Sequence, residues 1–228
     1  MNKVIRKLQA ACFYFRLFIH RLLGLPAQTP EEIAILKKLF AAYNGKSLKV
    51  FEWGSGLSTV YYSKYLRAQN ADFTWDAVDN HKGWYEQLSK VIFNLGLSDR
   101  VKLYLKEFLP FWQKAGWGQV PPPCGKFAPQ SQNEKDYINM PKILGKKFDV
   151  LIIDARFRRR CLEVAKDVLA SNGVVVMHDA QKPYYLVDIG NFTHSRLMDT
   201  GHWYWGQNPG CKLWLGSMNS KLVADKVV

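Results

Sequence analysis

The chain has 228 residues, 48% of them hydrophobic and 22% charged, so it can bury one sizeable core and is short for two domains. Its formal net charge of +13 favours acidic partners, namely nucleic acid, anionic lipid or an anionic small molecule. The sequence shows no repeat, no low-complexity tract and no nucleic-acid-binding motif, which makes nucleic acid the least favoured of these. Four cysteines without metal-type spacing indicate a reducing compartment, and we expect a cytoplasmic protein.

Residues 1–25 combine many apolar side chains with five basic residues and no acid. Arg16 interrupts the apolar run, so a membrane-spanning helix is not expected, and no small-residue cleavage site marks a signal peptide. We predict a basic amphipathic helix that precedes a domain over residues 26–228. Two interpretations stay open: the helix associates peripherally with an anionic membrane surface, or it packs on the domain or on a second copy in a homodimer.

Short apolar runs alternate with helical patterns after residue 26, which predicts a mostly parallel sheet with crossover helices. A first helix is expected from the N-cap Thr29 to about Tyr43, where Asn44-Gly45 ends it. The next expected elements are, in order, strand 47–52, helix 58–68, strand 73–78, helix 84–95, strand 101–105, strand 148–154, helix 160–170 and strand 174–179.

Residues 108–147 break this alternation and are rich in proline and glycine, apart from a weak helical pattern near Tyr137. They are predicted to form an inserted loop or lid. One helix and two strands are expected after residue 180, the strands pairing as an antiparallel hairpin. The fold class is therefore α/β: a Rossmann-like, doubly wound, mostly parallel sheet with an antiparallel C-terminal hairpin, in three layers.

A turn with two glycines, Glu52-Trp53-Gly54-Ser55-Gly56, follows the first strand and precedes a helix. This order forms a cradle for a nucleotide-type ligand, because glycines allow close approach and a helix start offers free N–H groups. Glu52 would face the phosphates of a dinucleotide, and Thr59 stands where a dinucleotide fingerprint has its third glycine. A ligand that carries an ammonium and a sulfonium suits Glu52 better, so S-adenosylmethionine (SAM) is favoured over a nicotinamide dinucleotide.

Polar residues end four of the predicted strands. They are Glu52 with the glycine turn, Asp79 with Asn80, Asp154, and His178 with Asp179. Ligands of open α/β sheets bind outside the carboxyl ends of the strands, at the point where the strand order reverses. We therefore expect these side chains to line one cleft.

On these motifs, residues 48–215 resemble the class I SAM-dependent methyltransferases, except over residues 108–147. The resemblance implies that the turn around Gly54 and Gly56 holds the methionine part of SAM and that Asp79 bonds the ribose hydroxyls. The full set of cofactor-binding residues that it implies is Glu52, Gly54, Ser55, Gly56, Ser58, Asp79, Asn80 and Asp154.

The segments 148–155 and 173–179 resemble the small O-methyltransferases of that family, which implies a hydroxyl acceptor and the catalytic residues Asp154, His178 and Asp179. In metal-dependent members the corresponding acids hold a divalent cation, so Asp154 and Asp179 would bind Mg²⁺ or Mn²⁺. His178 would then be a general base or a further ligand. His178-Asp179 departs from the Asp-Asn pair of catechol-type members. A second interpretation is therefore that His178 and Asp179 only shape the pocket.

Arg156 and Arg158 stand two and four positions after Asp154 and are expected at the mouth of the cleft. Guanidinium groups bind carboxylate or phosphate through paired hydrogen bonds, so we expect an anionic small molecule or glycan as acceptor. A solvated helix start is the competing interpretation. The sequence thus predicts a SAM-dependent O-methyltransferase. The alternatives are an inactive protein of this fold that binds at a membrane surface, a nicotinamide-dependent oxidoreductase and, least favoured, a nucleic-acid methyltransferase.

Overall fold

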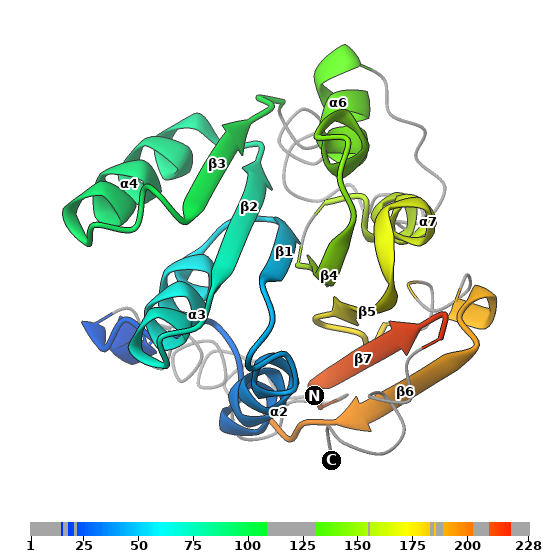
Figure 1. Cartoon of the computed structure of the whole chain (residues 1–228). Coiled ribbons are helices and arrows are strands. Elements are labelled where there is room, and N and C mark those ends of the chain that lie inside the picture. The colour runs from blue at the N-terminus through cyan, green and yellow to red at the C-terminus, as the bar shows by residue number, and fades with distance from the viewer. Residues whose placement is uncertain are drawn as a thin grey trace, which may run out of the picture.

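The computed structural model describes residues 15, 18–20, 22–108, 131–154, 156–182, 185, 189–202 and 210–219. These residues form a seven-stranded sheet in the order β3-β2-β1-β4-β5-β7-β6, with helices on both faces (Figure 1). The parallel strands are β1 (Leu48–Trp53), β2 (Phe73–Asp79), β3 (Val101–Leu105), β4 (Phe148–Ile153) and β5 (Leu169–Met177). The hairpin strands β6 (His194–Asp199) and β7 (Lys212–Ser217) pair antiparallel. The predicted fold class is confirmed.

The strand order reverses between β1 and β4. From β1 the chain first adds β2 and β3 on one side and then β4 and β5 on the other, all parallel. Strand β7 closes this second side because it pairs antiparallel with β5. The gap beyond the carboxyl ends of β1 and β4 is therefore the topological switch point, where open α/β sheets bind their ligands.

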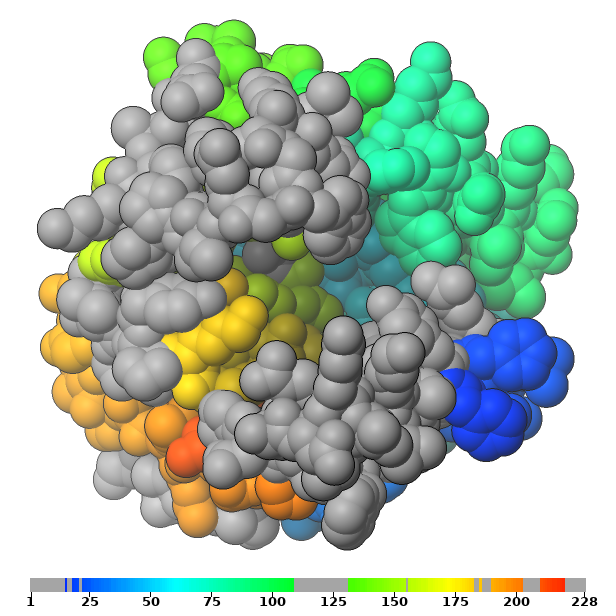
Figure 2. Space-filling view, turned by 180° about the vertical axis from the view of Figure 1, so that it is seen from behind, coloured from blue at the N-terminus to red at the C-terminus, as the bar shows by residue number. Residues whose placement is uncertain are grey.

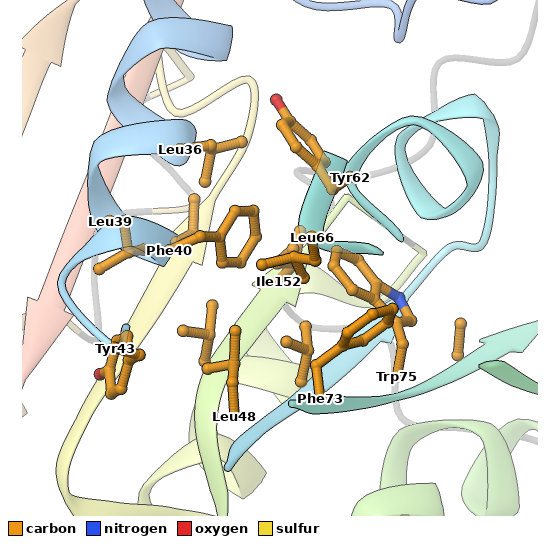
Figure 3. Packing of buried hydrophobic residues seen from close by; sticks show 14 of the residues in the cluster. Leu36, Leu39, Phe40, Tyr43, Leu48, Tyr62, Leu66, Phe73, Trp75 and Ile152 are labelled. Carbon is orange, nitrogen blue, oxygen red and sulfur yellow. The ribbon is translucent and has the colours of Figure 1, made fainter. Parts of the chain in front are cut away.

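One face of the sheet is covered by α2 (Pro30–Ala41), α3 (Leu57–Ala68) and α4 (Lys82–Asn94) (Figure 1). Figure 3 shows how Phe40 of α2 packs between Tyr62 of α3 and Trp75 of β2. The ring centroid of Phe40 lies 5.3 Å from that of Tyr62 and 5.8 Å from that of Trp75. These aromatic contacts join both helices to the sheet.

The other face carries α6 (Gln132–Ile143) and α7 (Arg158–Val168), packed on the second set of side chains of the same strands. Trp53 is fully buried there, and its indole N–H lies 3.2 Å from the carbonyl oxygens of both Tyr137 and Ile138. Successive strand residues point to opposite faces, so Val50 and Glu52 lie on the α3 side while Trp53 lies on the α6 side.

The first helix begins as predicted. Thr29 Oγ1 accepts from the backbone N–H of Glu32 at 3.2 Å, and Glu32 Oε2 accepts from the backbone N–H of Thr29 at 2.8 Å. This reciprocal capping box satisfies two donors that a helix start otherwise leaves unpaired. Helix α4 begins earlier than predicted, at Lys82, because the His81 side chain accepts from the N–H of Trp84 and caps it.

The region around β5 also differs from the prediction. Residues 169 and 170 were expected in a helix, but they begin β5, which leaves α7 to end at Val168. The pairing with β4 shifts register between Phe148 and Val150, and this lets the extra residues of β5 join the sheet. A Cβ at Gly173 would lie 2.9 Å from the carbonyl oxygen of Phe148, so the shifted pairing needs glycine there.

Within the predicted insertion at 108–147, residues 132–143 form α6, in agreement with the helical pattern near Tyr137. Residues 109–130, to which most of the predicted lid belongs, lie outside the described residues. After residue 180 the structure has a 3-10 helix (Ile189–Asn191) and the hairpin, while residues 203–209 are not described.

The described part of the predicted N-terminal helix exposes large apolar side chains. Phe15, Phe18, Leu22 and Leu23 are between 60% and 72% exposed, and the spacing of the first three places them on one side of a helix. Among the described residues, no helix is long and apolar enough to cross a membrane. Association of residues 1–25 with a membrane surface or a second copy stays a prediction.

Candidate functional site

A cavity of about 620 Å³ opens at the carboxyl ends of β1, β2 and β4, at the switch point. Its lining comes from six parts of the chain that are far apart in the sequence. These are residues 26–28 before α2, 54–58 after β1, 79–84 after β2, 107–108 after β3, Tyr137 of α6, and Asp154, Arg156 and Arg158 after β4. The volume suits a cofactor-sized ligand. Figure 2 shows the face opposite to that of Figure 1, hollowed near its centre between the cyan-green and the yellow parts of the chain.

The glycine turn forms one wall of the cavity. Gly54 has φ 89°, a left-handed conformation that side chains disfavour, and its N–H donates to the carbonyl oxygen of Val78 at 2.9 Å. The N–H of Gly56 donates to Thr59 Oγ1 at 2.9 Å, and the indole N–H of Trp84 donates to the carbonyl oxygen of Ser55 at 2.7 Å. The turn is therefore held from several sides while its remaining surface faces the cavity.

Asp79 lies on the cavity wall next to this turn and is buried. Its carboxylate accepts from the N–H of His81 at 2.8 Å and from Ser55 Oγ at 3.3 Å, and burial raises its pKa. A carboxylate has about four lone-pair positions, so two more donors from a ligand can be accepted. Asn80 also lines the cavity, and its side-chain N–H donates to the carbonyl oxygen of Phe108 at 2.9 Å.

Glu52 is the one predicted cofactor residue that the structure keeps out of the cavity lining. Its side chain is fully buried on the α3 side and accepts from Ser58 Oγ at 2.5 Å, Thr59 Oγ1 at 2.6 Å and the indole N–H of Trp75 at 3.0 Å. The carboxylate thus ties the first turn of α3 to the sheet. Its role here is to position the glycine turn.

Because Glu52 is buried, we expect the free energy of unfolding of the protein to depend on pH. Burial raises its pKa from 4.5 to about 7, although Ser58 and Thr59 oppose the shift by donating hydrogen bonds. Between these two values the unfolded chain loses the proton more readily than the folded one, so the free energy of unfolding falls as pH rises. Between pH 4.5 and 7, we expect the free energy of unfolding of wild type to fall by on the order of 3 kcal/mol relative to that of Glu52→Gln. Urea denaturation of both proteins across this range measures it, and parallel curves would contradict it.

The three predicted catalytic residues come together beyond β4 and β5. His178 Nδ1 lies 3.3 Å from Asp154 Oδ1 and 3.9 Å from Asp179 Oδ2. One ligand atom from each residue lies within 4.8 Å of the others, a spacing that could hold a metal ion. Asp179 has φ 57°, and so has Phe157 at the start of α7, so two non-glycine residues with left-handed backbone flank this cluster.

Arg158 reaches this cluster from α7. Its Nη2 donates to Asp154 Oδ1 at 2.7 Å and lies 3.4 Å from Asp179 Oδ2, and Nη1 donates to the Tyr185 hydroxyl at 3.1 Å. The guanidinium also stacks over the Tyr185 ring, 5.0 Å from its centroid. Burial opposes ionisation of Asp154, but His178 and Arg158 together hold its pKa below the ordinary value. The Arg158 side chain is thus paired within the protein. Arg156 also lines the cavity and is exposed.

Two further residues complete the cluster and were not identified from the sequence. Glu32 Oε2 lies 3.4 Å from His178 Nε2, and Glu32 Oε1 accepts from Thr200 Oγ1 at 3.1 Å. Burial disfavours a charged imidazole, yet Asp154 and Glu32 hold the pKa of His178 well above its ordinary value. The two carboxylates thus favour the protonated imidazole, a direction that does not suit the predicted role of general base.

The sequence pattern of Glu32 indicates only a helix cap, which the residue also forms. Its contact with His178 joins positions 146 residues apart, and Thr200 follows a strand end without any motif. Both contacts arise because α2 packs beside the carboxyl end of β5 and the hairpin. No local signal in the sequence could have revealed them.

The family model of the methyltransferase domain matches residues 51–180. No curated protein matches the chain. The crystal structure of the O-methyltransferase TomG from Streptomyces achromogenes in complex with SAM is similar, with TM-score 0.56, 14% identity and coverage of 92% of this chain and 90% of TomG. The O-methyltransferase from Bacillus cereus in complex with SAH (S-adenosylhomocysteine) has TM-score 0.55, 13% identity and coverage of 91% and 90%. A putative rRNA-methylase from Clostridium thermocellum has TM-score 0.52, 14% identity and coverage of 85% and 97%. At these identities the likeness concerns the fold.

Proposed function

Since the chain belongs to the family of the methyltransferase domain, we propose that it transfers a methyl group from SAM to a hydroxyl of an anionic small molecule or glycan. One observation carries the proposal: a cofactor-sized cavity at the switch point is lined by both the glycine turn and the Asp79 carboxylate. Two carboxylate oxygens suit two ribose hydroxyls, and the turn at Gly54–Gly56 leaves room for the methionine part. The TomG and Bacillus cereus enzymes of similar fold were crystallised with SAM and SAH.

Methyl transfer would be an in-line displacement: a bond would form between the acceptor oxygen and the methyl carbon while the carbon–sulfur bond of the sulfonium breaks. SAH would leave, and the hydroxyl proton of the acceptor would be lost to solvent. The protein mainly has to align the two reactants and exclude water. Asp154 lines the cavity and is kept ionised by Arg158 and His178, so it can accept a hydrogen bond from the acceptor hydroxyl and orient its lone pair. Its lowered pKa suits this orienting role better than that of a strong base.

Arg156 is the residue that we propose for the anionic group of the acceptor. It lies on the cavity lining two positions after Asp154 and is exposed. A guanidinium at the mouth of the cavity can bind a carboxylate or phosphate through two hydrogen bonds.

Replacing Arg156 by alanine tests the proposed acceptor class. We expect the KM for an anionic acceptor, such as a uronic-acid oligosaccharide, to rise roughly 10- to 100-fold, since charge-assisted hydrogen bonds contribute about 1.5–3 kcal/mol. The Kd for SAM and the KM for the corresponding neutral sugar should not change. Arg160→Ala is the matched control, because Arg160 pairs with Glu163 at 2.9 Å. An equal rise for charged and neutral acceptors, or transfer to RNA alone, would contradict the proposed acceptor.

A further inference from the structure

The cluster around Asp154 contains the ligands of a divalent-metal site together with a permanent protein cation. Asp154, His178 and Asp179 offer three ligand atoms at metal-type spacing, as metal-dependent O-methyltransferases would require. Arg158 Nη2, however, lies 2.7 Å from Asp154 Oδ1 and 3.4 Å from Asp179 Oδ2. The guanidinium therefore stands between the same two carboxylates that would bind the metal.

Several contacts fix the guanidinium in this position. The Arg158 side chain is only 10% exposed, it stacks on the Tyr185 ring, and it donates to the Tyr185 hydroxyl. Phe157, directly before it, holds the left-handed backbone from which α7 starts and packs against Phe108, with ring centroids 5.6 Å apart. A guanidinium held on both sides in this way cannot leave the carboxylates without also breaking its contacts to Tyr185.

The remaining candidate ligand is also engaged by carboxylates. Both ring nitrogens of His178 face carboxylates, Nε2 towards Glu32 at 3.4 Å and Nδ1 towards Asp154 at 3.3 Å. Arg158 places a permanent positive charge within 3.4 Å of both Asp154 and Asp179. A divalent ion at this position would lie beside that charge and add two further positive charges.

We propose that Arg158 takes the place of a divalent cation at the acceptor side of this site, so that the wild-type protein binds and needs no metal there. The inference deepens the proposed methyltransferase function. It further implies that removing the guanidinium leaves Asp154, His178 and Asp179 able to bind a divalent ion.

Titration with Mn²⁺ alone tests this without acceptor or cofactor, and the electron paramagnetic resonance signal reports the free ion. Over the micromolar range, wild type is expected to give the same free-ion signal as buffer without protein. Arg158→Ala should bind one Mn²⁺ per chain at least about 100-fold more tightly than wild type, since like charges held together cost several kcal/mol. Arg158→Lys keeps a cation and Arg160→Ala alters an arginine outside the cluster, so both should behave as wild type. Adding Asp179→Asn to Arg158→Ala should abolish the new binding.

Tight Mn²⁺ binding by wild type that Asp154→Asn removes would overturn the proposal, because the site would then be a metal site. A folded Arg158→Ala protein that binds no Mn²⁺ would overturn it as well. If Arg158→Ala does not fold, as judged by circular dichroism, Arg158→Gln supplies the uncharged variant, and the wild-type titration decides by itself whether a metal binds. Failure of the methyltransferase function is recognised separately, since wild type would then not bind SAH.

Discussion

Asp154→Ala is expected to lower the free energy of unfolding by about 3–5 kcal/mol at pH 7 and to reduce methyl transfer roughly 100-fold or more. Asp154 is the carboxylate that Arg158 and His178 share, at 2.7 Å and 3.3 Å, and both of these side chains are nearly buried. Its removal leaves two cations close together in a poorly solvated site. Urea denaturation measures the stability, and turnover of labelled SAM measures the transfer.

Asp149→Ala provides the control for this variant, because Asp149 lies in the same strand at the opposite end of the sheet. Its carboxylate accepts an exposed hydrogen bond from the N–H of Lys49 at 2.9 Å. The free energy of unfolding of the control should fall by less than about 1 kcal/mol, and its methyl-transfer activity should match that of wild type. Equal stability of Asp154→Ala and wild type would show that the cluster is not the buried ion network described above.

Asp79→Ala is expected to weaken SAM binding about 100-fold or more. The carboxylate lies on the cavity wall, and each of two hydrogen bonds from ribose hydroxyls to a charged acceptor contributes about 1.5–3 kcal/mol. The change also removes the acceptor for the N–H of His81 and for Ser55 Oγ, which loosens the glycine turn. Calorimetric titration gives the two Kd values.

Asp72→Ala is the matched control for this second variant. Asp72 is exposed, just before β2, and pairs with Arg100 at 2.8 Å far from the cavity lining. Its loss should leave the Kd for SAM as in wild type. If Asp79→Ala also binds SAM like wild type, the ribose does not lie on Asp79.

The order of the elements and the position of the cavity could be predicted from the sequence, because both depend on local patterns. Apolar runs of strand length between helical patterns indicate parallel strands, and polar residues at their carboxyl ends meet at one edge of the sheet. The turn at Gly54, Asp79 and Asp154 accordingly line a common cavity. The helix and strand limits around Arg158 and Leu169 shifted, where a left-handed Phe157 and a register shift intervene, and α4 began earlier because His81 caps it.

The direction and pairing of the polar side chains were harder to predict, since they depend on tertiary packing. Glu52 shares the face of Val50 in the alternation of β1 and so points to α3, although its position at the strand end suggested the cleft. Arg158 was expected to bind the acceptor, but α7 turns it onto Asp154 and Asp179. The contact of Glu32 with His178 depends on how α2 packs near β5, which no local pattern encodes.

Calorimetric titration of the wild-type protein with S-adenosylhomocysteine tests whether this cavity binds SAM, and it requires no knowledge of the acceptor. We expect saturable binding of one ligand per chain with a micromolar Kd, which Asp79→Ala weakens and Asp72→Ala does not. An absence of binding in wild type, or saturable binding of NADH in its place, would contradict the assignment of this cavity to SAM.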